Sequence, residues 1–97
     1  MKLITAIVNK EDSKNVCNEL IKAKFYVTRL ATTGGFLMAG NVTILIGVDE
    51  EKVQTVIDII REHSHSRKQM IPTAMPIEVT VGGATIFVTN VERFEKL

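Results

Sequence analysis

The chain has 97 residues, enough for one domain with a single core, and its hydrophobic content of 45% excludes a wholly disordered protein. It carries 12 basic and 11 acidic residues, a net charge of +1, so nothing suggests a surface built for nucleic-acid phosphates. Cys17 is the single cysteine, which excludes an internal disulfide and favours a reducing, cytoplasmic setting. The apolar stretch at the N-terminus is too short for a signal peptide or a membrane span.

The first expected elements are a strand and a helix. Residues 2–8 (KLITAIV) form an apolar run rich in β-branched side chains, typical of a central strand buried on both faces. Asp12 or Ser13 is the expected N-cap of the helix, which should end near Ala23 or Lys24. Its apolar stripe comprises Val16, Cys17, Leu20 and Ile21.

Two further strands and a loop follow the helix. Residues 25–32 (FYVTRLAT) alternate in polarity and predict a second strand, and residues 42–48 (VTILIGV) predict a third that is again apolar on both faces. The intervening loop, LATTGGFLMAGN at residues 30–41, places large apolar side chains where turn residues are expected. No residue from Leu30 through Val48 is charged, so this segment should pack against something or close over something.

The second half begins with a helix capped by Asp49, and its apolar spacing comes from Val53, Val56, Ile57 and Ile60. Residues 63–76 contain both prolines and are expected to be irregular. Residues 77–81 (IEVTV) and 84–89 (ATIFVT) flank Gly82–Gly83, which favours a tight hairpin between them. A short polar tail ends the chain.

This order predicts an α+β, ferredoxin-like βαββαβ fold with an additional C-terminal hairpin strand, in one domain spanning residues 1–97. Right-handed crossovers place both helices on one face of the antiparallel sheet. Because strands 2–8 and 42–48 are apolar on both faces, the second face should be covered by a partner or by another copy of the chain, and we expect a homo-oligomer. The alternative is a monomer whose loops fold over that face.

The glycine-rich loop is the main candidate for a binding site. It lacks the Gly-Lys-Ser/Thr of a phosphate-binding Walker loop and does not open a helix as GxGxxG does. Its glycines allow backbone N–H groups to form an anion-binding concavity, and Phe36 offers a stacking face for a base. Thr28 and Asn41 offer neutral groups for a purine edge. The equally open alternative is a structural turn whose apolar tip docks on a neighbouring subunit.

Other candidates have simpler explanations. Gly47 within a strand favours packing against a helix over a ligand-binding role. His63 and His65 lack a cluster of further ligands, so a solvated helix end is favoured over a metal site. Cys17 fits a core position better than a nucleophile. No catalytic set emerges, and we expect a binding protein rather than an enzyme.

Three segments carry a family resemblance: MKLITAIV at the start, LATTGGFLMAGNVTILIGV in the middle and IEVTVGGATIFV near the end. Together they resemble the PII-like cyclic-di-AMP receptor proteins of Gram-positive bacteria over essentially the whole chain. The resemblance implies a ferredoxin-like subunit, a PII-like homotrimer and three equivalent cyclic-di-AMP sites between adjacent subunits. It implies no enzymatic activity, no metal and no cofactor beyond the ligand itself.

The resemblance also implies roles for individual positions. Thr28 and Asn41 match residues that hydrogen-bond the ligand. Gly47 matches a glycine that leaves room for a base, which reverses the preference for packing. The segment that supplies backbone contacts and an apolar wall for an adenine corresponds to Gly35, Phe36 and Leu37.

Several positions depart from the family pattern. Tyr26 stands where an arginine commonly approaches the ligand, although its ring can stack and its hydroxyl can donate. Lys24 replaces a usual asparagine, Met38 a frequent arginine, and Lys96 a glutamine offered by the neighbouring subunit's tail. The 64–76 segment is shorter than the loop of typical members.

The resemblance therefore leads to a PII-like signal-transduction protein that binds cyclic-di-AMP, with an unidentified downstream protein target and no nucleic-acid polymer or membrane partner. The alternatives are a PII-like trimer with altered ligand preference, a ligand-independent adaptor in which the uncharged loop seals subunits together, and a metal-responsive trimer using His63 and His65.

Overall fold

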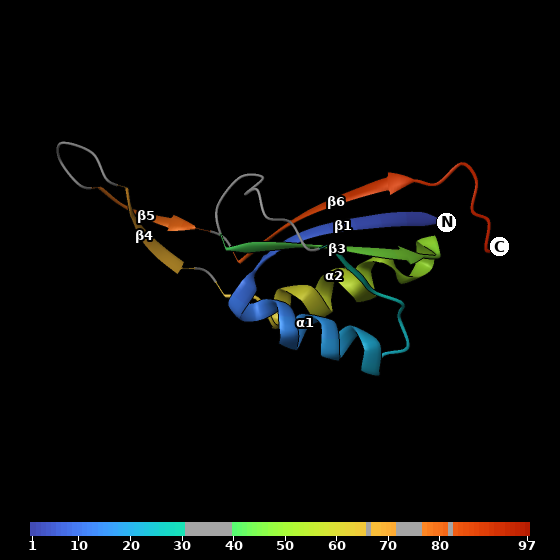
Figure 1. The fold of residues 1–97 in the computed structure, drawn as a ribbon, viewed down its shortest axis with the longest axis horizontal. Coiled ribbons are helices and arrows are strands. Elements are labelled where there is room, and N and C mark those ends of the chain that lie inside the picture. The colour runs from blue at the N-terminus through green and yellow to red at the C-terminus, as the bar shows by residue number, and fades with distance from the viewer. Residues whose placement is uncertain (31–39, 66, 72–76, 82) are drawn as a thin grey trace.

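The computed structural model describes residues 1–30, 40–65, 67–71, 77–81 and 83–97, which form an α+β fold (Figure 1). In chain order its elements are β1 (Lys2–Asn9), α1 (Lys10–Lys22), β2 (Thr28–Leu30), β3 (Asn41–Val48), the 3-10 turn η1 (Glu50–Lys52), α2 (Val53–Glu62), β4 (Arg67–Ile71), β5 (Ile77–Val81) and β6 (Ala84–Asn90). The main sheet is antiparallel with strand order β2-β3-β1-β6, consistent with the predicted ferredoxin-like fold. Strands β4 and β5 form a separate two-stranded sheet, here called the arm, that projects from one end (Figure 1).

Both helices lie on the same face of the main sheet, as the connections predict (Figure 1). Alternate residues of the two central strands point toward them and are buried, namely Ile4, Ala6 and Val8 of β1 and Ile44, Ile46 and Val48 of β3. The helices contribute Val16, Leu20, Val56 and Ile60 to the same core. Burying each large side chain stabilises the fold by about 1.5–3 kcal/mol, so this covered face holds the domain together.

The opposite face of the sheet, called here the open face, has a different character. The register places Leu3 opposite Gly47 and Thr5 opposite Leu45, and all four alternate with core residues. Phe87 of β6 lies opposite Thr5 and remains 51% exposed. The helices do not cover this face (Figure 1). The central strands thus present apolar side chains on both faces, as expected, but only one face has a helical cover.

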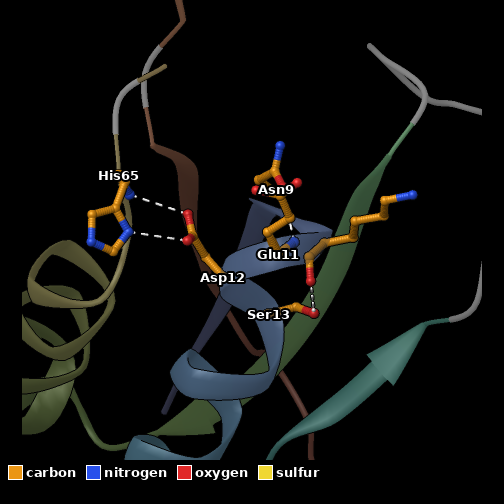
Figure 2. A network of polar contacts seen from close by, with 6 residues as sticks. Asn9, Glu11, Asp12, Ser13 and His65 are labelled. Atoms are coloured by element: carbon orange, nitrogen blue, oxygen red, sulfur yellow. Dashed lines mark hydrogen bonds and ion pairs between the residues drawn. The ribbon is translucent and has the colours of Figure 1, made fainter.

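Helix α1 begins earlier than expected. Its N-cap is Asn9, whose side chain accepts a hydrogen bond from the Glu11 backbone N–H at 2.9 Å, so the prediction of Asp12 or Ser13 as the cap is wrong (Figure 2). Ser13 lies inside the first turn and donates to the Lys10 carbonyl at 2.9 Å. Ile21 was predicted to lie on the apolar stripe but is 57% exposed, whereas Val16 and Leu20 of that stripe are fully buried.

Asp12 instead links α1 to the base of the arm through contacts with His65. Asp12 is 4% exposed, and one carboxylate oxygen accepts a hydrogen bond from the His65 backbone N–H at 3.1 Å, while the other lies 3.1 Å from His65 Nδ1 (Figure 2). On the returning side, a Cβ at Gly83 would lie 2.8 Å from the His65 backbone nitrogen. We call Ser64, His65 and Gly83 the neck of the arm. Gly83 is required there for close approach of two chain segments rather than for a turn.

The predicted hairpin between residues 77–81 and 84–89 is wrong. Strand β5 pairs with β4, from Arg67 opposite Val81 to Ile71 opposite Ile77, whereas β6 pairs with β1. Residues 63–76 are therefore not wholly irregular, since they contain β4. The fourth strand of the main sheet is β6, whose Ile86 lies opposite Ala6 and packs against the core. The arm is thus an insertion between α2 and β6, not a C-terminal addition.

Two other elements, α2 and β2, are shorter than predicted. Asp49 precedes η1 in an extended conformation and its side chain makes no capping hydrogen bond, so α2 begins only at Val53. Strand β2 covers Thr28–Leu30 rather than residues 25–32, of which 31 and 32 lie outside the described part of the chain. None of the described helices has the length and apolarity needed to cross a membrane.

Candidate ligand-binding site

A groove of about 680 Å³ lies on the open face, at the end of the sheet remote from the arm. Its apolar lining comes from Met1, Leu3, Leu45, Val91 and Phe94, and its polar lining from Tyr26, Thr28, Glu95 and Lys96, with Gly47 between them. Strand pairing accounts for part of this gathering, because Thr28 lies opposite Leu45 and Leu3 lies opposite Gly47. The volume falls within the range of about 300–1,000 Å³ that is typical of small-molecule sites.

The turn after α1 delivers Tyr26 to the groove. The Lys24 N–H donates to the Ile21 carbonyl at 2.9 Å and the Phe25 N–H to the Leu20 carbonyl at 3.0 Å, a Schellman arrangement that ends the helix. The Schellman motif reverses the direction of the chain, which then runs toward β2. Phe25 then packs against the core, and Tyr26 on the opposite side is left 85% exposed.

The C-terminal tail forms another wall. The Val91 N–H donates to the Met1 carbonyl at 3.2 Å where the chain leaves β6, and Phe94 remains 65% exposed. The Lys96 ammonium lies 5.6 Å from the centroid of the Tyr26 ring, within the range of a cation–π interaction. An apolar floor is therefore bordered by an aromatic ring and a cation.

Gly47 is exposed at the floor of this groove. A Cβ built there would meet, among the described residues, only the Met1 Cε at 3.7 Å, which is an ordinary contact with a flexible side chain. Packing against a helix, the explanation favoured by sequence alone, is therefore wrong. The missing side chain leaves space on the open face. That a base occupies this space, as the family resemblance implies, stays a prediction.

A smaller hollow of about 200 Å³ adjoins the groove and shares Met1, Tyr26 and Gly47 with it. The rest of its lining is more polar and consists of Lys24, Phe25, Val48, Asp49 and Lys52. The Tyr26 side chain thus belongs to two adjoining spaces, one mainly apolar and one lined by two lysines and a carboxylate.

The predicted site residues do not all meet within one chain. Tyr26, Thr28 and Gly47 line the groove. Asn41 shares the open face but lies opposite Asn9 at the other end of β3, roughly 20 Å from Gly47 at the rise of an extended strand. The predicted positions Gly35, Phe36, Leu37 and Met38 lie outside the described residues. The groove also includes Leu3 and Val91, which the sequence analysis did not single out.

Metal and nucleophile candidates have structural explanations. His65 contacts Asp12 at the neck, and no group of three or more potential metal ligands occurs within the described part of the chain. Cys17 packs against the core, and its burial raises the pKa of the thiol above the usual 9.0, an effect that Arg29 opposes. A thiol that holds its proton is a poor nucleophile near neutral pH.

The chain is similar to a known protein family and to a solved structure. A family model described as "Cyclic-di-AMP receptor" matches residues 1–97. Among solved structures, one described as a functionally unknown protein from Pediococcus pentosaceus ATCC 25745 is 44% identical to this chain. The alignment covers 99% of this chain and 96% of that one, with a TM-score of 0.76.

Proposed function

Since the chain belongs to the cyclic-di-AMP receptor family, we propose that it is a PII-like signal-transduction protein that binds cyclic-di-AMP at clefts between the subunits of a homotrimer. In this role it is a cytoplasmic binding protein, not an enzyme, and it passes the signal to a protein target. The observation that carries the proposal is the groove on the open face, in which Tyr26, Thr28 and Gly47 lie around an apolar floor.

The chemistry of the groove suits a purine nucleotide. A flat base needs an apolar surface without protruding side chains, which Leu3, Leu45 and the bare backbone of Gly47 supply. Its polar edge needs neutral donors and acceptors, and the Thr28 hydroxyl can serve as both. The Tyr26 ring is exposed and can stack on a base.

A site between subunits accounts for the separation of Asn41 from the groove. One chain places Asn41 roughly 20 Å from Gly47, so a single ligand in the groove does not reach both positions within that chain. In a closed ring of subunits, the Asn41 end of one sheet can lie beside the Tyr26 end of the next. The open face, with Phe87 half-exposed, provides the apolar surface for such an assembly.

Calorimetric titration of the purified protein with cyclic-di-AMP tests the proposal. We expect saturable heat with one ligand per subunit and a higher melting temperature, and a much weaker response to cyclic-di-GMP, which carries the same phosphodiesters on a different base. Thr28→Val keeps the shape and removes the hydroxyl, so affinity should fall about two- to tenfold, the range of a neutral hydrogen bond. Thr55→Val, on the exposed surface of α2, is the matched control.

One result would count against cyclic-di-AMP recognition, and another against the role of Asn41 alone. Absence of heat and of a thermal shift at high ligand concentration would rule it out. If the protein is nevertheless trimeric, the ligand-independent adaptor becomes the better explanation of the open face. An Asn41→Ala variant that binds as tightly as the wild type would remove Asn41 from the site.

A further inference from the structure

The two hollows beside Tyr26 differ in charge, which bears on how an anionic ligand is held. The groove has mainly apolar walls, with Lys96 and Glu95 at one side. The smaller hollow carries Lys24 and Lys52, and among the described residues that line it Asp49 is the one carboxylate. Because both spaces share Met1, Tyr26 and Gly47, one ligand can occupy the groove and extend past the Tyr26 ring into the smaller hollow.

Lys24 occupies a backbone position that favours a different residue. Its φ is 73°, and it is the one non-glycine residue with positive φ in the described ranges. It stands at the left-handed position of the Schellman motif, where glycine is usual because a Cβ is unfavourable there. A lysine is therefore not explained by helix termination. Backbone strain of this kind clusters at ligand-binding sites, and the Lys24 side chain lines the small hollow.

Lys96 approaches the same ring from the tail. Its ammonium lies 5.6 Å from the Tyr26 centroid, and it lines the groove. The Tyr26 side chain is a phenol and supplies no cation to a phosphate. The cations along these walls are Lys96 in the groove and Lys24 and Lys52 in the smaller hollow, and Lys24 is two residues from Tyr26 in the chain.

Resting on the proposed function, we propose that Lys24 and Lys96 are the phosphate-binding cations of this site. A base lies on the apolar floor of the groove, and an anionic phosphodiester lies at the Tyr26 ring, between the two ammonium groups. Each lysine donates a charge-assisted hydrogen bond to a phosphodiester oxygen, and the Lys96 ammonium leaves the ring face to do so. The negative charge of the ligand is thus recognised by Lys24 in the turn after α1 and by Lys96 in the tail.

Substitutions of Lys24 separate charge from backbone strain. Lys24→Gly removes both, so it should raise the melting temperature of the ligand-free protein while weakening cyclic-di-AMP binding about tenfold, the loss expected for a hydrogen bond to a charged group. Lys24→Gln removes the charge and keeps the strained backbone, so affinity should fall similarly without a gain in melting temperature. Lys96→Met should also weaken binding about tenfold.

The control is Lys22→Met, which makes the same change in net charge. Lys22 is exposed at the end of α1, pairs with Glu19 at 3.2 Å and lines neither hollow. Affinities are measured by calorimetry at low and high salt. Wild-type and Lys22→Met proteins should lose affinity equally as salt rises, whereas the Lys24 and Lys96 variants should lose less, because an interaction that salt screens has been removed.

The outcomes distinguish this inference from the proposed function. A wild-type protein that does not bind cyclic-di-AMP overturns the proposed function itself. A wild-type protein that binds, with Lys24→Gln and Lys96→Met equal to it in affinity and salt dependence, overturns the role of the lysines alone. A Lys24→Gly protein with lower melting temperature and lower affinity, beside an unaffected Lys24→Gln, would show a structural role for this position instead.

Discussion

The two faces of the main sheet are built from the same strands but serve different purposes. On the covered face, Ile44 and Ile46 are fully buried beneath the helices. On the open face, the intervening Thr43 and Leu45 are only partly buried, and Gly47 has no side chain. The covered face is thus complete within one chain, whereas the open face combines apolar area with hydroxyl groups and a gap. Stability resides mainly in the first face, and the proposed ligand recognition in the second.

The largest expected effect comes from truncating the covered face. Ile44→Ala removes a fully buried side chain and should lower the free energy of unfolding by about 2–5 kcal/mol. Its neighbour Thr43 points to the open face, so Thr43→Ala should cost less than about 1 kcal/mol. Urea unfolding at one protein concentration provides the measurement. Equal losses for the two variants would remove the distinction between the faces.

A charge on the open face should break the assembly and leave the subunit folded. Phe87→Asp places a carboxylate in the apolar surface proposed to pack between subunits, so the assembly should weaken at least a hundredfold, roughly 3 kcal/mol. Val88 on the same strand is 42% exposed but alternates to the other face, which makes Val88→Asp the control. Sedimentation should show monomers only for Phe87→Asp, with the circular dichroism of both variants unchanged. A Phe87→Asp protein that sediments like the wild type would contradict the proposed interface.

The contact between Asp12 and His65 at the neck, at the end of the sheet opposite the groove, can be tested by substitution. Asp12→Ala removes a buried carboxylate that contacts the His65 backbone N–H and Nδ1, so stability should fall by about 2 kcal/mol. Amide exchange at His65 should rise with it. Asp58→Ala disrupts an exposed ion pair with Arg61 and should change stability by less than about 0.5 kcal/mol. If exchange at His65 stayed at the wild-type rate, the arm would be held by other contacts.

Much of the main sheet was predictable because strong patterns specify it. The apolar run of β1, the apolar run of β3 and the spacing of Val56 and Ile60 each fix an element and its buried side. The pairing of β5 was not predictable, since residues 77–81 followed by two glycines are typical of a hairpin. Gly83 instead lies against His65, a contact between residues far apart in the sequence that no local pattern reveals.

The candidate site was predictable only in part, for a similar reason. Strand register brings Thr28 and Gly47 to the groove, whereas the turn after α1 places Tyr26 there. Tyr26 and the ligand role of Gly47 were named from family resemblance, while Thr28 was also a candidate from its own chemistry. The tail residues Val91 and Phe94 belong to a segment without periodicity, whose path depends on the Val91 contact with Met1. The roles of Gly35, Phe36 and Leu37 stay predictions, because these residues lie outside the described part of the chain.

The smallest effect is expected at Cys17 of α1, which is partly buried against the core. Burial raises its pKa above 9.0 in the folded chain, so between about pH 9 and the raised value the unfolded chain loses the thiol proton first. The stability associated with this proton is therefore present below pH 9 and lost as the pH rises. Cys17→Ala removes the titration, so its melting temperature, measured with reductant from pH 7 to 10, should fall less steeply than that of the wild type. If the melting temperatures of the wild type and Cys17→Ala changed with pH in parallel, burial would not raise the pKa of Cys17. Arg29 favours the thiolate, so Arg29→Gln should make the melting temperature fall more steeply with pH than in the wild type.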